Sequence, residues 1–381
     1  MVYLDNAATT YPKPPSVISK NSYAMVNYGA NPGRSGHKLS METGEAIYNA
    51  RKICGDFFGA QTENVCFMLN CTEAINTAVK GLAEEKSHFI TSDLEHNAVL
   101  RPLTAISKKE GISFSIAAVS NNDNETVNNF RRLIRPETKA IVCTAASNVT
   151  GTILPYRRIA ELCRKNNLCF ILDAAQGAGI LPISLSDGIN IICAAGHKGL
   201  YGPMGTGLMV TDGKFRLKTL IEGGTGSASK DPEMPEFLPD RFEGGTINTS
   251  GAIALGAGVS FVNEKGIRSI YEHEWQLCAY AHGQMRNMKG IILYNSFTRK
   301  NAPLFSFNIQ GLDSDKTASV LSDRGFYLRG GFHCAYLAHR KLGTLESGTV
   351  RFAPSVFTTK NEVNAFLKTV RKIAASSKQY R

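Results

Sequence analysis

The stretch LCFILDAAQGAG (168–179), followed by INIICAAGHKGLYGP (189–203), decides the fold of this chain. Each stretch opens with a short apolar run that is typical of a buried strand. A turn rich in glycine and polar residues follows each run. Ligands of open α/β sheets bind at the carboxyl ends of the strands. The two turns, which carry Asp173, Gln176 and Lys198, therefore predict a binding site.

Short apolar strands alternate with amphipathic helices from residue 65 to about residue 210. This alternation predicts an α/β fold, with a mostly parallel sheet and helices on both of its faces. The further expected strands are 64–69, 87–92, 112–119, 139–145 and 205–211, and the expected helices are 72–85, 99–111, 123–135 and 156–166.

The rest of the chain suggests a second, smaller unit. A segment rich in Gly, Pro and Ser (222–246) is too long and irregular for a simple connection, so we expect a functional loop. Strands are expected at 304–311 and 349–355, and a helix at 361–374. We predict an N-terminal segment (1–15), a large cofactor-binding domain (16–250) and a small α/β C-terminal domain (251–381) that carries a nucleophilic cysteine loop.

Composition narrows the class of protein. The 381 residues are 43% hydrophobic and 20% charged, which is typical of a globular chain. The N-terminus lacks the features of a secretory signal, and no apolar run is long enough to cross a bilayer, so we expect a cytoplasmic protein without membrane contact. The net charge of +11 indicates a solvated basic surface or an acidic protein partner, and nucleic acid is an unlikely partner because no nucleic-acid motif accompanies it.

Nine cysteines are present, an odd number without a CxxC pair. Several, such as Cys143 and Cys169, lie inside apolar runs and are expected to be small buried hydrophobes in a reducing compartment. The spacing indicates neither a disulfide framework nor a metal site.

Asp173 and Lys198 together point to a cofactor. Two such side chains at neighbouring strand ends suit pyridoxal phosphate (PLP), with the lysine forming a Schiff base and the aspartate keeping the pyridine nitrogen protonated. The alternative is an ordinary ion pair in a solvated loop.

Two other strand ends carry residues that suit such a cofactor. In NCTEAIN (70–76), backbone N–H groups at Cys71 and Thr72 and the Thr72 hydroxyl form a cradle for phosphate, although Thr72 with Glu73 also fits plain helix capping. His96, in LEHNAV, suits stacking on a flat ring and proton transfer, although a lone loop histidine is more often structural.

Three residues suit the binding of anions or a phenolate oxygen, and each has a simpler alternative. Asn148, in SNVTGTILP, suits a hydrogen bond to a phenolate or a substrate carboxylate, or a turn. Thr246, in FEGGTIN, suits phosphate binding across a subunit interface, or a glycine-rich turn. Arg351, in GTVRFAP, suits a bidentate clamp on a carboxylate, or a surface ion pair.

Cys334 differs from the other cysteines. In RGGFHCAY (329–336) it lies beside His333 and near Arg329, among glycines. A thiol flanked by cationic groups on a flexible loop can ionise near neutral pH, which suits a nucleophile; the alternative is a structural cysteine.

Together these segments resemble the class V, fold-type I family of PLP-dependent enzymes, most closely the cysteine desulfurases and, among them, the SufS-type and selenocysteine lyase group. The resemblance covers nearly the whole chain. It rests on ten motifs in the family's order: LDNAATT, NPGRSGHKLS, CTEAIN, EHNA, SNVTGT, DAAQ, GHKGLYGP, FEGGT, RGGFHC and VRFAP.

The resemblance implies a role for each matching residue. Lys198 holds the cofactor covalently, Asp173 pairs with the ring nitrogen, Gln176 bonds the ring oxygen and His96 stacks on the ring. The phosphate is held by Thr72 and His197 with Thr246 of the partner subunit in a homodimer. Asn148 and Arg351 position the substrate carboxylate, and Cys334 accepts sulfur.

The implied activity is conversion of L-cysteine to L-alanine with a persulfide on Cys334 for transfer to an acceptor protein. A selenocysteine lyase, an aminotransferase and a β-eliminating lyase stay open. Relatives commonly have Ser or Thr where this chain has Ala195, so one phosphate hydrogen bond, worth about 1–3 kcal/mol, is expected to be missing. The loop after Cys334 also departs from SufS-type sequences, which leaves the acceptor and the choice between cysteine and selenocysteine open.

Overall fold

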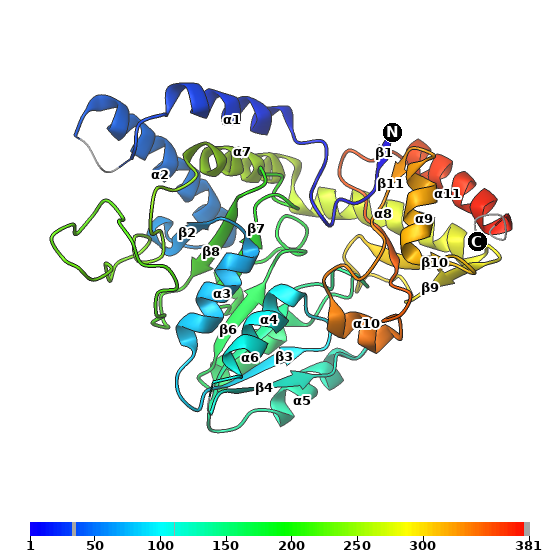
Figure 1. Cartoon of the computed structure of the whole chain (residues 1–381), viewed down its shortest axis with the longest axis horizontal. Coiled ribbons are helices and arrows are strands. Elements are labelled where there is room, and N and C mark those ends of the chain that lie inside the picture. Colours follow the sequence, from blue (N-terminus) through cyan, green and yellow to red (C-terminus); the bar gives the residue numbers. More distant parts are fainter. Residues whose placement is uncertain (33–35, 110, 377–381) are drawn as a thin grey trace.

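A computed structural model describes residues 1–32, 36–109 and 111–376. At its centre, within these residues, lies a seven-stranded sheet in the order β2-β8-β7-β6-β5-β3-β4 (Figure 1). Strands β3 to β7 pair in parallel, and β8 runs antiparallel to both β2 and β7. The strands are β2 (Val65–Met68), β3 (His88–Ser92), β4 (Ser113–Ala117), β5 (Thr138–Thr144), β6 (Cys169–Asp173), β7 (Ile191–Ala195) and β8 (Gly207–Thr211).

Helices cover both faces of this sheet, because alternate residues of each central strand face opposite cores. In β5, Ala140 and Val142 pack towards α3 and α4, whereas Ile141 and Cys143 pack towards the opposite layer. The first layer contains α3 (Cys71–Leu82) and α4 (Asn97–Ile106). The second contains α2 (Lys38–Phe58), α5 (Asp123–Arg132), α6 (Tyr156–Lys165) and α7 (Thr249–Lys265), and α1 (Pro15–Asn27) packs on α7.

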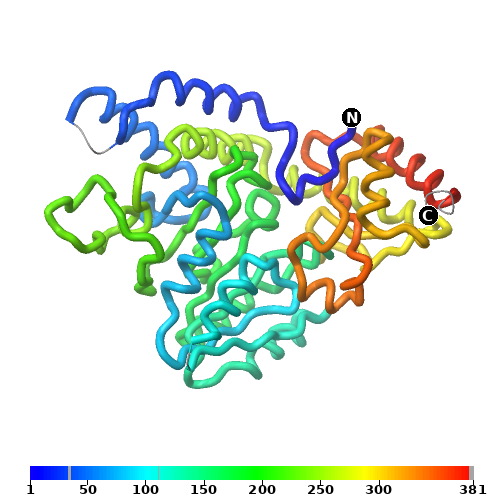
Figure 2. Tube along the Cα trace, in the orientation of Figure 1, coloured from blue at the N-terminus to red at the C-terminus, as the bar shows by residue number. Residues whose placement is uncertain are grey.

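A second core lies beside the large sheet. Its antiparallel sheet has the order β12-β10-β9, and its apolar side chains include Phe305, Phe352 and Phe366. The chain's first strand belongs here, since β1 (Val2–Tyr3) pairs in parallel with β11 (Phe326–Tyr327). Figure 2 shows the N-terminal segment beside the C-terminal part of the chain. The other elements are β9 (Ile291–Leu293), β10 (Phe305–Ile309), β12 (Val350–Phe352), α8 (Ile267–Arg286), α9 (Ser314–Ser322), α10 (Tyr336–Leu342), α11 (Lys360–Ala375) and the short 3₁₀ turns η1 (Thr62–Asn64) and η2 (Leu185–Asp187).

The predicted α/β fold with a mostly parallel sheet is confirmed, and each strand and helix named from the sequence is present. The segment 222–246 contains neither helix nor strand, as expected. The expected helix 99–111 is instead Asn97–Ile106, because His96 caps it two residues earlier and residues 107–109 form turns. Residues 33–35 of the NPGRSGHKLS motif and residue 110 lie outside the described residues.

The predicted division at residues 15 and 250 stays a prediction. Among the described residues, we find no helix of the length and apolar character needed to span a membrane.

Candidate active site

Glycines lock the two decisive turns together. A Cβ on Gly179, whose φ is +81°, would lie 2.0 Å from the Gly199 carbonyl oxygen. A Cβ on Gly199 would lie 2.3 Å from the Ala178 carbonyl oxygen. Real Cβ atoms never approach backbone oxygens so closely, so only glycine fits at both positions. The glycines therefore let the turn after β6 support the turn that carries Lys198.

The N-terminal segment holds the lysine turn from the other side. The Thr10 backbone N–H donates to the His197 carbonyl oxygen over 3.1 Å, and the Thr10 hydroxyl lies 3.1 Å from the Lys198 carbonyl oxygen. Lys13 Nζ also donates to the His197 oxygen over 2.7 Å. In the sequence, Thr10 belongs to the family motif LDNAATT (4–10) and Lys13 lies just after it, but neither residue was predicted to have a role. The only signal was the presence of hydroxyl side chains in that motif.

Lys198, Asp173 and Cys71 line the same cavity, which has a volume of about 230 Å³. Burial lowers the pKa of Lys198, which favours the neutral, nucleophilic amine. Burial raises the pKa of Asp173, although the Ala175 N–H donates to Asp173 Oδ1 over 2.9 Å and partly opposes the shift. The Cys71 sulfur lies 3.5 Å from the same oxygen, and burial raises its pKa well above the ordinary value, so it stays a thiol.

His96, which follows β3, and Gln176, in the turn after β6, also line the cavity. His96 Nδ1 accepts a hydrogen bond from the Ala98 N–H over 3.0 Å, so the proton of the neutral ring is on Nε2. Burial and the nearby Lys198 lower the pKa of His96 to about 4, so the ring is neutral at pH 7. Gln176 Nε2 donates to the Ala7 carbonyl oxygen over 2.8 Å, which orients its amide.

The N-terminus of α3 also lines the cavity. Asn70 caps this helix, since its side-chain oxygen accepts from the Glu73 N–H over 2.9 Å. The alternative in which Thr72 with Glu73 serves as the cap is therefore wrong. Residues Cys71 and Thr72 form the first turn of the helix, where backbone N–H groups lack partners within the helix. This turn suits an anion.

His197 lines the same cavity. Burial and the neighbouring Lys198 lower its pKa to about 4, so its imidazole is neutral at pH 7. A neutral ring can still donate one hydrogen bond to a phosphate oxygen.

Asn148 and Arg351 form the side of the cavity towards the C-terminal core. Arg351 is 2% exposed and bonds both the Asp5 carboxylate (2.8 Å) and the Asn148 carbonyl oxygen (3.0 Å). Asn148 Nδ2 donates to the His333 carbonyl oxygen over 2.8 Å. Asp5, which sequence reasoning did not single out, is therefore the charge partner of this arginine.

Cys334 lies in an adjoining pocket of about 370 Å³ that shares Thr72, His96 and Ala98 with the main cavity. It is the exposed cysteine of the nine, and the other eight are buried, as expected for small hydrophobes. Arg329 Nη2 lies 3.8 Å from its sulfur.

The turn that carries Cys334 is strained and only partly as expected. Both His333 (φ +48°) and Cys334 (φ +55°) are in the left-handed region, which non-glycine residues seldom adopt. His333 is buried, Nε2 lies 2.9 Å from the Thr349 carbonyl oxygen, and burial holds its pKa well below the ordinary value. Of the two residues expected as cations, His333 is therefore neutral at pH 7.

Thr246 lies apart from these residues. It is exposed, and its hydroxyl accepts from Asn31 Nδ2 over 3.4 Å. Glu243, three residues before Thr246, forms a bidentate ion pair with Arg51, at 2.5 and 2.8 Å. This ion pair holds the C-terminal end of the long loop 222–246 against α2.

The residues fit pyridoxal phosphate. Four polar atoms of the lining residues are buried without a hydrogen-bond partner within the described chain: Asn148 Oδ1, His197 Nδ1, His333 Nδ1 and Arg351 Nε. Such atoms are costly unless a ligand pairs with them. The set combines an amine for an aldehyde, an acid for a ring nitrogen and a helix N-terminus for a phosphate. Ala195 lines the cavity and offers no hydroxyl.

Comparison with known proteins places this chain in a family. The model for "Aminotransferase class-V" matches residues 2–366, so the chain belongs to that family. Members of this family depend on PLP, as the lysine and aspartate motifs predicted.

Relatives within the family are named as desulfurases. A probable cysteine desulfurase of Methanothermobacter thermautotrophicus is 29% identical, over 98% of this chain and 94% of that protein. Probable cysteine desulfurase 1 of Mycobacterium leprae is 31% identical over 98% of this chain. The chain spans 62% of the length of that protein and 55% of a relative from Mycolicibacterium paratuberculosis.

A solved structure of a cysteine desulfurase is also similar to this chain. The apo structure of cysteine desulfurase from Thermococcus onnurineus NA1 aligns with a TM-score of 0.92 and 28% identity, covering 98% of this chain and 95% of that one. The resemblance to PLP enzymes of fold type I is therefore confirmed at the level of the fold.

Proposed function

We propose that this protein is a PLP-dependent cysteine desulfurase that converts L-cysteine to L-alanine and leaves a persulfide on Cys334. The observation that carries the proposal is the pairing of two sites. A buried amine and a buried acid lie in one cavity, and an exposed thiol lies in the pocket that shares Thr72 and His96 with it. An aminotransferase needs the first site but has no use for the second.

The proposed net reaction is balanced. The substrate's Cβ–Sγ bond breaks, and a bond forms between that sulfur and Cys334 Sγ. The electron pair of the broken bond stays with carbon, which takes a proton and becomes the methyl group of alanine. The transferred sulfur is oxidised from thiol to sulfane sulfur, and the substrate carbon is reduced. No external oxidant is needed, and a thiol reductant or acceptor releases the persulfide.

The cofactor supplies an electron sink that stores charge when the α-proton of the substrate leaves. Lys198 Nζ would hold the cofactor covalently and would then move that proton, a task that its lowered pKa favours. Asp173 would offer its side chain to the ring nitrogen, Gln176 would bond the ring oxygen, and the neutral ring of His96 would cover the cofactor.

The anionic groups of cofactor and substrate have separate partners in this proposal. The first turn of α3, at Cys71 and Thr72, holds the phosphate together with His197. Asn148 and Arg351 hold the substrate carboxylate, and Arg351 keeps one nitrogen, Nε, free of protein partners among the described residues. Its present bond to Asp5 is the contact that the substrate carboxylate competes with.

We extend the proposal to assembly. The exposed position of Thr246 suits a role in the site of a second subunit in a homodimer. Helix α1 supports this, because Ile18, Met25 and Val26 on it are 57%, 69% and 82% exposed. Exposed apolar groups on one helix are typical of a protein interface. We also propose a sulfur-acceptor protein, a cytoplasmic location and a domain division into 1–15, 16–250 and 251–381.

The test is the absorbance of the purified protein in the band of protein-bound PLP, followed by alanine release from L-cysteine and L-selenocysteine with a reductant. We expect the band, and alanine from cysteine. Alanine from selenocysteine alone would indicate a selenocysteine lyase. A keto acid with ammonia would indicate β-elimination, amino transfer to an added keto acid an aminotransferase, and the absence of a band would overturn the proposal.

A further inference from the structure

Tyr201 is strained and fully buried, three residues after Lys198. Its φ is +56°, and its side chain is 0% exposed. A bulky residue adopts the left-handed region only where its surroundings hold it there, and such residues cluster at functional sites. Its backbone N–H donates to the Lys198 carbonyl oxygen over 2.8 Å, so Tyr201 closes the turn that presents the lysine.

Packing against α7 holds the tyrosine ring. The ring meets Phe261 edge-on, with centroids 5.2 Å apart, and Phe357 at 90°, with centroids 6.0 Å apart. The backbone of α7 also approaches the turn, because a Cβ on Gly258 would lie 2.3 Å from the Leu200 carbonyl oxygen. The turn of Lys198 therefore packs closely against α7.

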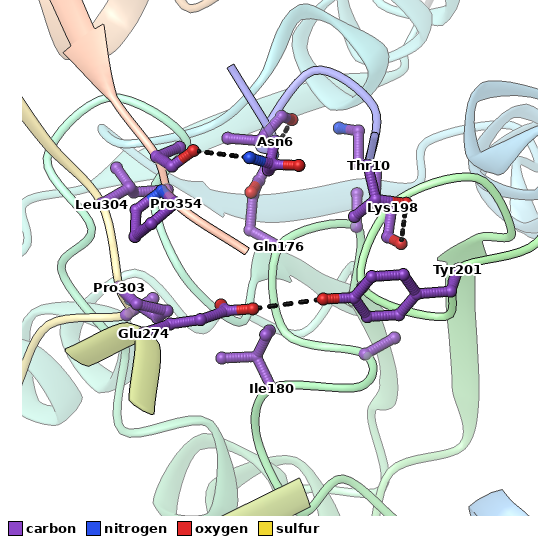
Figure 3. A pocket seen from close by; sticks show the side chains of 16 residues that line it. Asn6, Thr10, Gln176, Ile180, Lys198, Tyr201, Glu274, Pro303, Leu304 and Pro354 are labelled. Atoms are coloured by element: carbon purple, nitrogen blue, oxygen red, sulfur yellow. Dashed lines mark hydrogen bonds between the residues drawn. The ribbon is translucent and has the colours of Figure 1, made fainter. Parts of the chain in front are cut away.

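The tyrosine hydroxyl joins the lysine turn to the C-terminal part of the chain. It accepts from the Val356 N–H over 3.2 Å and donates to Glu274 Oε1 over 3.3 Å. Glu274 lies on α8 and is 4% exposed, and burial raises its pKa to about 8. Figure 3 shows Tyr201 and Glu274 facing one another across the rim of a small cavity.

Glu274 does not belong to the cofactor cavity. The small cavity, of about 40 Å³, lies between it and the groups Gln176 and Lys198, which also line this space (Figure 3). The Glu274 carboxyl group therefore lies at the small cavity and not at the cofactor cavity. The hydrogen bonds that connect Glu274 to the lysine turn run through the Tyr201 hydroxyl and the Tyr201 backbone N–H.

We propose that Tyr201 and Glu274 are positioning residues, which clamp the turn of Lys198 between α7, α8 and the segment after β12 and so fix the direction of the lysine amine. Glu274 supplies the acceptor that orients the tyrosine hydroxyl. The inference rests on the proposed function, because it concerns the lysine that would carry the cofactor. Neither residue lines the cavity that would hold substrate and cofactor.

The experiment compares Tyr201→Phe, Glu274→Leu and Glu274→Gln as holoenzymes. The readouts are visible circular dichroism of the bound cofactor, which reports its orientation, and kcat and KM for L-cysteine. Removal of one oriented hydrogen bond is expected to lower kcat by about 3- to 10-fold with KM little changed, and to reduce the visible dichroism. Glu274→Gln keeps a neutral acceptor oxygen and should restore both readouts.

Tyr271→Phe is the matched control. Tyr271 is also on α8, and its hydroxyl bonds the carbonyl oxygens of Arg299 (3.3 Å) and Asn301 (3.1 Å), away from the lysine turn. We expect a lower unfolding temperature with unchanged visible dichroism and kcat.

The outcomes separate the two proposals. If wild-type protein binds no cofactor and releases no alanine, the proposed function fails and this inference fails with it. If wild type is active but Tyr201→Phe and Glu274→Leu behave like Tyr271→Phe, only the positioning role is overturned. A Glu274→Gln variant as impaired as Glu274→Leu would also contradict it.

Discussion

The turn of Lys198 and the turn of Cys334 present two candidate reacting groups in opposite ways. Lys198 is enclosed by glycine contacts on one side and by Thr10 and Lys13 on the other. Cys334 is exposed, in a pair of left-handed non-glycine residues. Its backbone contacts the N-terminus of α4, where the Asn97 N–H donates to the Cys334 carbonyl oxygen over 2.7 Å.

The difference follows from what each group must do in the proposed reaction. An amine that moves a proton must keep its direction, because proton transfer requires a distance of about 3 Å and good alignment. A sulfur carrier must meet the substrate inside and an acceptor outside, so it needs access. The left-handed backbone of His333 and Cys334 turns the thiol outward, and the bond to Asn97 keeps the turn at the N-terminus of α4.

Replacement of Lys198 or Cys334 is expected to have the largest effects on the activity. Lys198→Ala is expected to lose the band of covalently bound cofactor and to lower alanine production by about 1,000-fold or more. Cys334→Ala should keep the band, because its turn is held by backbone atoms, and should lower alanine production on the order of 100-fold.

Absorbance spectra and an alanine assay with a thiol reductant measure both effects. Full alanine production by Cys334→Ala would remove the cysteine from the reaction. Turnover by Lys198→Ala would remove the lysine.

A methyl group placed between the two locked turns should have the next largest effect. Gly199→Ala forces a Cβ to within 2.3 Å of the Ala178 carbonyl oxygen, a backbone atom that cannot yield easily. We expect a loss of about 3 kcal/mol in the free energy of unfolding, with weaker cofactor binding.

Urea denaturation and cofactor titration provide the measurements. The control is Gly283→Ala, at an exposed position of α8 with nothing within 4 Å of the added Cβ. That change should stabilise by up to about 1 kcal/mol. Equal stability of the two variants would contradict the glycine lock.

The smallest expected effect concerns the contribution of a buried acid, Glu95, to the stability of the fold. Glu95 is 0% exposed, its Oε1 accepts from the Thr144 N–H over 3.1 Å, and it also bonds the Ser92 hydroxyl. Burial raises its pKa from 4.5 to about 8. The native state therefore holds a proton that the unfolded state releases, so this contribution to stability is complete below pH 4.5 and is lost as the pH rises through 8.

Glu95→Gln tests this pH dependence of stability, because the amide side chain does not ionise. Relative to wild type, we expect the variant to gain about 1–2 kcal/mol in the free energy of unfolding between about pH 5 and about pH 6.5. Denaturation at both pH values measures the gain, and Glu264→Gln, at an exposed position on α7, is the control. A gain that does not change with pH would show that Glu95 is ionised in the native state.

The sequence predicted the sheet and most of the cavity because both follow from local patterns. Short apolar runs end at Asp173 and Ala195, and glycine-rich turns follow. Parallel strands bring their carboxyl ends to one edge, so residues up to about 100 positions apart, such as His96 and Lys198, were expected in one place. The Asn70 cap was missed because Asn70 and Thr72 are both residue types that cap helices, and they lie only two positions apart.

Other features depend on contacts that no local pattern contains. The bond between Arg351 and Asp5 joins residues 346 positions apart, and the clamp of Tyr201, Glu274 and Val356 joins three distant segments. Likewise, the neutral state of His333 results from its burial, whereas the sequence shows only a histidine beside a cysteine.

The sequence by itself therefore determined the α/β class, the family and the residue types of the cavity, because strand period, turn chemistry and motif order are written along the chain. Tertiary structure alone decided which side chains are charged, which are held rigid and which are exposed. Those properties arise from burial and from close approach between distant segments, and neither can be read before the chain is folded.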